Sequence, residues 1–307
     1  MRHAVLAPIV MVALAAAGCG DTVSQSRADD TSSSHPPPAD PPADTDWLVG
    51  RGAVLDHGDG PELCLGVMAE SLPPQCSGPK VRGWDWAEIK EKESQSGTTW
   101  TGDYVVTGTY EDNTFTLTKP PVNAEEYDGP WPAPPEDPDE SDRVSTTACP
   151  EPEGGWVPVD PAKTTEASLD EVVREANRLE GFADLWWDQS INDTDDEMAM
   201  NDPEKLVVNV RVTTDLAEAE SALRRVWGGG LCVTQAKRTQ AELSRIQIEV
   251  NDLPGVLSSG SERDGIYVMV VYDDGSLQRR VDEKYGVGVV QVHSALLSLR
   301  DLLDAQG

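Results

Sequence analysis

Five cysteines carry the most distinctive chemistry in this sequence: Cys19, Cys64, Cys76, Cys149 and Cys232. Zinc sites built from cysteine use short CxxC-type spacings with histidine partners, and the sequence has neither. Cys19 is set apart by the apolar segment before it. The remaining even number predicts two disulfides in an exported protein, and four cysteines allow three pairings. Cys64 and Cys76 lie close together within one predicted domain, which favours pairing them and pairs Cys149 with Cys232.

The first 18 residues predict an export signal. A basic start, Arg2 and His3, precedes the apolar run 4–17, which is too short for a membrane-spanning helix of about 20 residues. The small residues 16–18 directly before Cys19 resemble the lipobox of bacterial lipoproteins. That resemblance implies cleavage before Cys19, lipid on its thiol and anchoring at the outer face of the cytoplasmic membrane. Plain secretion is the alternative.

The segment 19–46 predicts a disordered stalk. It is rich in Ser, Asp and Pro and almost free of large apolar side chains, so it buries too little surface to offset the entropy of ordering. Its HPPPADPP portion favours polyproline II. Such a segment would hold the following domains away from the membrane.

The formal net charge of −31 excludes two classes of partner. Nucleic-acid binding needs clustered Lys and Arg against the phosphates, and anionic lipid headgroups would be repelled. The charge either serves solubility or attracts cations or a basic partner.

Residues 47–120 predict a small β domain, an OB-like barrel or a sandwich of short strands. Its clearest element is the hairpin GDYVVTGTYEDNTFTLT, with a Glu-Asp-Asn turn. Trp84 and Trp86, in the short segment GWDW, alternate along the chain. They are the candidates for an exposed aromatic binding patch, although buried core tryptophans are the simpler interpretation.

Residues 121–145 predict an acidic, proline-rich linker, and 146–307 predict a second domain in an α+β protein. Alternating helices and strands there favour a two-layer α/β sandwich with a mixed sheet of ferredoxin-like character. GIYVMVVY is its most apolar strand and is expected at the centre. Three helices are expected to begin with capping boxes, at Ser168/Glu171, Asp215/Glu218 and Thr239/Glu242. No repeat is visible.

The acidic loop 188–204 is the one segment with ligands for a metal ion. Oxygen-bearing side chains lie at positions 1, 3, 5, 9 and 12 of an EF-hand-like spacing, which suits Ca²⁺: Asp193, Asp195, Glu197, Asn201 and Glu204. Met198 stands where the turn needs glycine, and Pro203 stiffens the exit. A solvated loop without metal is the alternative, and no other cofactor is expected.

No catalytic motif is present: the sequence lacks HExxH, G-x-S-x-G, a P-loop and a dinucleotide fingerprint. The segments ELCLG, PPQCSGP, GWDW, VTGTY and ACPEPEGGW, with the later VVNVRV, LCVT and DGSLQRR, resemble those of uncharacterised exported proteins of actinobacteria. That resemblance covers most of the chain after the stalk and implies no activity.

The sequence therefore favours a non-enzymatic, lipid-anchored protein that binds an envelope protein or a glycan. A Ca²⁺-responsive surface protein using the 188–204 loop and an envelope hydrolase with an unrecognised site are the alternatives.

Overall fold

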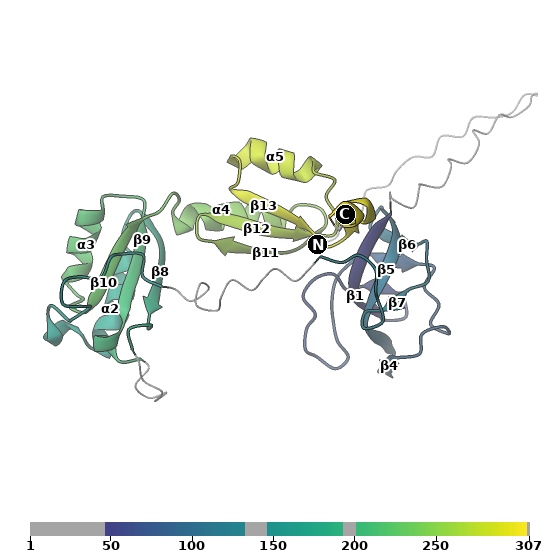
Figure 1. Ribbon diagram of the computed structural model, residues 1–307, viewed down its shortest axis with the longest axis horizontal. Coiled ribbons are helices and arrows are strands. Elements are labelled where there is room, and N and C mark those ends of the chain that lie inside the picture. Colours follow the sequence, from purple (N-terminus) through teal and green to yellow (C-terminus); the bar gives the residue numbers. More distant parts are fainter. Residues whose placement is uncertain (1–46, 133–145, 193–200, 306–307) are drawn as a thin grey trace, which may run out of the picture. The chain divides into compact units, whose positions relative to one another are not determined.

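The computed structural model describes residues 47–132, 146–192 and 201–305 and shows a mixed α+β protein (Figure 1). The predicted export signal, the stalk and Cys19 lie outside the described residues. The strands are β1 Leu48–Asp56, β2 Glu62–Leu63, β3 Lys80–Arg82, β4 Lys92–Gln95, β5 Thr98–Glu111, β6 Thr114–Leu117, β7 Val122–Asn123, β8 Phe182–Asp188, β9 Val207–Val212, β10 Gly230–Gln235, β11 Val256–Glu262, β12 Gly265–Val270, β13 Val290–Ser294 and β14 Leu297–Ser298. The α-helices are α2 Glu166–Ala176, α3 Leu216–Arg224, α4 Gln240–Asn251, α5 Ser276–Tyr285 and α6 Leu299–Asp304, with 3₁₀ turns η2 Pro161–Lys163 and η3 Pro203–Lys205.

The N-terminal sheet is organised around the long strands β1 and β5. Its pairings run β1–β2–β3–β6–β5 and return to β1, with β4, β7 and β14 attached. The predicted hairpin is confirmed as β5 and β6, and its turn residues Asp112 and Asn113 have positive φ angles of 46° and 55°. Such a turn matches the right-handed twist of its strands. Residues from most of these strands, including Val54 and Phe115, fill one core.

The C-terminal residues join the N-terminal sheet, so the predicted division at residue 146 does not separate two independent domains. β14 pairs with the start of β1, and the Leu299 N–H donates to the Trp47 carbonyl over 2.8 Å. The predicted linker also begins later than residue 121. β7 pairs with β5, and Tyr127 and Trp131 pack against an apolar cluster, because this acidic stretch still carries aromatic side chains that can be buried. Residues 133–145 lie outside the described part.

Residues 166–294 form two three-stranded sheets in place of the predicted single mixed sheet. Each belongs to a unit with the order helix–strand–strand–helix–strand, α2 to β10 and α4 to β13. In each, the first two strands are antiparallel and the last two parallel, so the second strand is central. β12, from the predicted apolar segment, is one of these central strands. The repeated order is not visible in the sequence because corresponding elements carry different side chains, as in VVNVRV of β9 and GIYVMV of β12.

Helix starts follow the capping chemistry with one correction. The side chains of Asp215 and Thr239 accept hydrogen bonds from the backbone N–H groups of Glu218 (2.9 Å) and Glu242 (3.1 Å), as predicted. Helix α2 is capped by Thr165, which accepts from the Ser168 N–H over 3.2 Å, so it begins before the predicted Ser168. Nothing between these residues breaks a helix, and either hydroxyl can serve as the cap.

A buried arginine joins the two repeated units. Arg211 of β9 is 8% exposed and forms ion pairs with Asp184 of β8 at 3.1 Å and with Asp264, in the turn between β11 and β12, at 2.6 Å. It also donates to the Arg263 carbonyl over 3.2 Å. We call these residues the arginine network. Within the described ranges, every helix is too short or too polar to cross a lipid bilayer.

Candidate functional site

Two disulfides are present, and both have the predicted pairing. Cys64 is bonded to Cys76, and Cys149 to Cys232, across sequence separations of 12 and 83 residues. Structural disulfides persist in oxidising compartments, so they indicate an extracytoplasmic environment.

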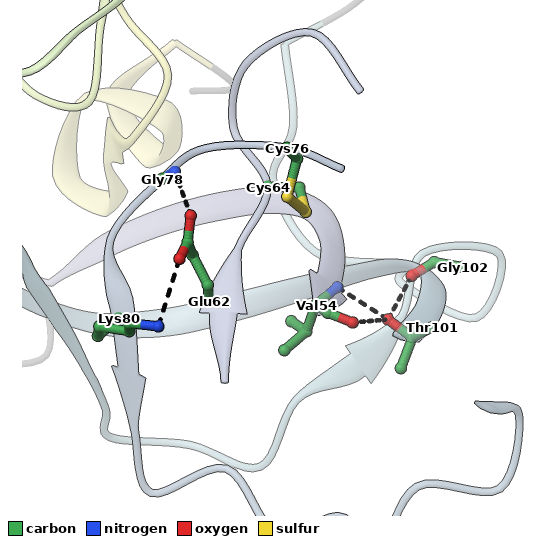
Figure 2. Close-up of a disulfide and its surroundings, with 8 residues drawn as sticks. All are labelled: Val54, Glu62, Cys64, Cys76, Gly78, Lys80, Thr101 and Gly102. Carbon is green, nitrogen blue, oxygen red and sulfur yellow. Dashed lines mark hydrogen bonds and ion pairs between the residues drawn. A yellow bond between two sulfur atoms is a disulfide. The ribbon is translucent and has the colours of Figure 1, made fainter. Parts of the chain in front are cut away.

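The first disulfide closes a loop that is held at both ends. Glu62 comes two residues before Cys64, and its carboxylate accepts from the Gly78 N–H over 3.0 Å and pairs with Lys80 at 3.4 Å (Figure 2). Within the loop, the Ala69 N–H donates to the Gln75 carbonyl over 2.8 Å. The loop 64–78 of the β domain is therefore constrained by the disulfide and by these hydrogen bonds.

A groove of about 660 Å³ lies between this loop and the β4–β5 ribbon; we call it the disulfide-loop groove. Trp100 of β5 is a buried part of its lining, and the apolar side chains of Met68 and Leu72 line the loop side. These two are 46% and 69% exposed. Apolar side chains at a concave surface are the usual form of a ligand site.

The β5 side of the groove is fixed by a hydrogen-bonded threonine. Thr101 is buried; its hydroxyl accepts from the Val54 N–H over 2.9 Å and donates to the Gly102 carbonyl over 2.7 Å (Figure 2). The register between β1 and β5 shifts beside Val54, between Ala53 and Leu55. The hydroxyl thus satisfies the backbone at this irregularity and holds the groove's wall in place.

The rim of the disulfide-loop groove is acidic. Glu70, Glu91 and Glu93 line it, against the single cation Lys92. The Lys92 ammonium group donates to the Trp86 carbonyl. The groove thus combines an apolar interior with a surplus of negative charge.

Of the two interpretations of Trp84 and Trp86, their packing on the core of the β domain favours core tryptophans over an exposed patch. Trp84 lies in the core, where its ring packs edge-on against Trp86 at 5.6 Å and Tyr104 at 5.5 Å between ring centroids. The indole N–H of Trp86 donates to the Asp56 carboxylate over 3.2 Å. Alternation along the chain placed the pair on one strand face, but GWDW lies outside the strands, with Trp84 buried and Trp86 partly buried against the same core.

The predicted calcium ligands divide between described and undescribed residues. Asp193, Asp195 and Glu197 lie outside the described residues. The Asn201 side-chain oxygen accepts from Gln189 over 2.9 Å, and the Glu204 backbone N–H donates to Asp202 over 3.0 Å. These contacts build a local turn, and the calcium interpretation stays a prediction.

The residues that line the groove were missed in the sequence. A usable signal was present: Val67, Met68 and Leu72 are apolar residues inside a short loop between two cysteines. A loop this short cannot bury them all. The sequence matches no protein-family model, and no curated protein matches it.

Proposed function

We propose that this protein is a lipid-anchored binding protein of the cell envelope, and that its disulfide-loop groove holds a cationic, partly apolar peptide segment of a partner protein. The observation that carries the proposal is the groove itself, an apolar concavity on a covalently constrained loop with a carboxylate rim. Constraint of the loop before binding lowers the entropy lost on association.

Charge complementarity selects the partner. The whole chain carries a formal net charge of −31, and the groove adds a local surplus of carboxylates. Anionic polymers are repelled by such a surface, whereas a basic segment is attracted over a Debye length of about 8 Å at physiological salt.

Binding is favoured over hydrolysis by the exposure of the acids. Glu70, Glu91 and Glu93 are exposed, and a general acid in a hydrolase is ordinarily buried so that its pKa rises. The calcium-responsive alternative depends on Asp193, Asp195 and Glu197, which lie outside the described residues, together with Asn201 and Glu204, whose contacts build a local turn.

The finer fold assignments are part of the proposal. A ring β1–β2–β3–β6–β5 with a parallel β3–β6 pair supports an OB-like barrel. Each helix–strand–strand–helix–strand unit supports a reduced ferredoxin-like arrangement without its first strand. The resemblance to exported actinobacterial proteins agrees with the disulfide pairing and stays a proposal.

The anchor is tested at Cys19. Replacing Cys19→Ser removes the thiol that would carry lipid, so the protein is expected to move from the membrane fraction to the medium. Fractionation followed by intact-mass measurement reads both location and lipidation. Retention of the variant in the membrane fraction would exclude the anchor.

The groove is tested with a capped hexapeptide of alternating lysine and leucine. We expect calorimetry to show binding to the full chain, and binding about tenfold weaker to Met68→Ser/Leu72→Ser, because two exposed apolar contacts are lost. Both side chains are largely exposed, so the fold is expected to be retained.

The matched control replaces Val157→Ser and Val159→Ser, two valines that are 65% and 72% exposed and lie outside the groove. This variant is expected to bind the peptide as the wild type does. A hexapeptide of alternating glutamate and leucine is expected not to bind. Equal affinity of both serine variants for the lysine peptide would reject the groove as the site. Binding of a glycan, without binding of the peptide, would reject a peptide as the partner.

A further inference from the structure

A second concavity shares a wall with the disulfide-loop groove; we call it the tyrosine hollow. Its volume is about 330 Å³, and Glu91 lines both it and the groove. Tyr104 of β5 and Asn123 of β7 lie opposite each other in the strand pairing, and both line the hollow. The hollow is therefore built on two paired strands of the N-terminal sheet.

Tyr104 presents an unpartnered polar group to this hollow. The side chain is 6% exposed, its ring packs against Trp84, and its hydroxyl has no hydrogen-bond partner among the described residues. Burial raises the pKa of Tyr104, and the negative charges of Glu91 and Glu126 raise it further. The phenol thus stays neutral at physiological pH, and its oxygen is available to accept a hydrogen bond. The oxygen is not fully enclosed, so it can accept a hydrogen bond from a donor that enters the hollow.

The carboxylates around Tyr104 favour a positively charged donor. Glu88, Glu91 and Glu126 line the hollow with one cation, Lys90. The Asn123 side-chain amide donates to the Glu91 carboxylate over 3.3 Å, which orients this acid at the shared wall. Carboxylates only accept hydrogen bonds when ionised, so the lining accepts from a cationic donor.

We propose that the tyrosine hollow binds the basic side chain, of lysine or arginine, of the partner segment whose apolar part lies in the disulfide-loop groove. The cationic group would donate to the Tyr104 oxygen and to the carboxylates of Glu91 and Glu126. Charge-assisted hydrogen bonds of this kind are stronger than neutral ones. The inference rests on the proposed function for the identity of the partner, whereas the site for a cation stands on the hollow alone.

The hollow is tested with a small probe that cannot span the groove. n-Pentylammonium is titrated at physiological ionic strength into the full chain labelled with ring-¹³C tyrosine, with 1-pentanol as the neutral control of equal length. We expect pentylammonium, and not pentanol, to shift the NMR signals of Tyr104, which Tyr104→Phe identifies by their loss. Shifts by both probes, or by neither, would overturn the proposal.

Two carboxylate variants separate a built site from general attraction to an acidic protein. Glu126→Gln is expected to weaken pentylammonium binding about tenfold, because it loses a charged acceptor in the hollow. Glu125→Gln removes the same charge from the neighbouring residue, which does not line the hollow, and is expected to change the affinity less than about twofold. Equal effects of the two variants would show general electrostatic attraction and reject the site.

The groove variant keeps the two proposals distinguishable. Met68→Ser/Leu72→Ser is expected to bind pentylammonium as the wild type does while losing affinity for the lysine peptide. If the lysine peptide binds this variant as tightly as the wild type, while pentylammonium binds as expected, the cation site in the hollow is supported and the proposed function is rejected. If the variant loses affinity for the lysine peptide and pentylammonium does not bind at Tyr104, the groove is supported as the peptide site and the hollow is rejected as a cation site.

Discussion

Removing the Cys149–Cys232 disulfide, by Cys149→Ser/Cys232→Ser, is expected to lower the free energy of unfolding by roughly 4–5 kcal/mol. The crosslink spans a sequence separation of 83 residues, so it removes a large part of the conformational freedom of the unfolded chain. It also fixes residue 149 to the middle of β10, where Cys232 is buried and lies opposite Asn209 of β9. Domains are stable by only about 5–15 kcal/mol, so this is a large share of the total. Urea unfolding followed by tryptophan fluorescence measures it.

The shorter disulfide provides the matched comparison. Cys64→Ser/Cys76→Ser opens a separation of 12 residues and is expected to cost less, roughly 3 kcal/mol. Its second effect is on binding, because the loop that carries Met68 and Leu72 loses its covalent constraint. Larger destabilisation from the shorter crosslink would contradict the chain-entropy argument. If the 149/232 variant does not fold, reduction of the folded wild type under native conditions, followed by limited proteolysis, gives the same ordering.

Much of the fold is readable from local patterns. The β5–β6 hairpin is specified by alternating side chains and an Asp-Asn turn, and α3 and α4 by Asp215 and Thr239 as caps. These signals act over a few residues, so they survive in any tertiary context. The disulfide pairing was also within reach, because separation and count left few choices.

The features of the fold that the sequence did not predict depend on contacts between residues far apart in the chain. β14 joins the N-terminal sheet through pairings such as Val49 with Leu297, and α6 packs against that sheet; no local pattern reports either contact. Residues 259–261 (SGS) have a composition that is unfavourable for a strand, yet they lie within β11, because pairing with the apolar strand β12 overrides their weak strand propensity.

The candidate site was hidden for the same reason. Trp100 and Met68 are far apart in sequence and line one groove only because the Cys64–Cys76 loop projects beside β5. The hollow around Tyr104 likewise needs β7, a two-residue strand in a stretch whose composition predicts a linker. Composition reports whether a segment can form a core of its own, and it does not report whether the segment can pack on a neighbour.

Replacing Arg211→Ala is the second large effect and is expected to cost roughly 2–4 kcal/mol, since it leaves two partly buried carboxylates without their buried cation. Asp184 loses its 3.1 Å partner and Asp264 its 2.6 Å partner. The control is Arg51→Ala, whose exposed pair with Asp103 at 3.3 Å is expected to contribute at most about 1 kcal/mol. Urea unfolding measures both. Equal losses would show that the arginine network is no stronger than a surface pair. Should Arg211→Ala fail to fold, Arg211→Lys keeps the charge but not the forked donors, and is expected to lose less.

The difference in unfolding free energy between wild type and Arg211→Ala depends on pH through the carboxylates of Asp184 and Asp264. Burial raises the pKa of Asp184 above its ordinary 3.8, whereas the pKa of Asp264 is lowered: burial opposes this, but hydrogen bonds from the Lys237 N–H and Arg211 prevail. A lowered pKa contributes stability above the unfolded value and loses it as the pH falls through the folded value. On acidification Asp184 is therefore protonated first, and Arg211 keeps Asp264 as its partner. The advantage of wild type over Arg211→Ala is expected to persist from pH 7 to about pH 4, and to vanish only in stronger acid. An advantage already lost well above the ordinary carboxyl pKa of 3.8 would show that Asp184, within the first repeated unit, and not Asp264 of the second unit, accounts for the stability that Arg211 contributes.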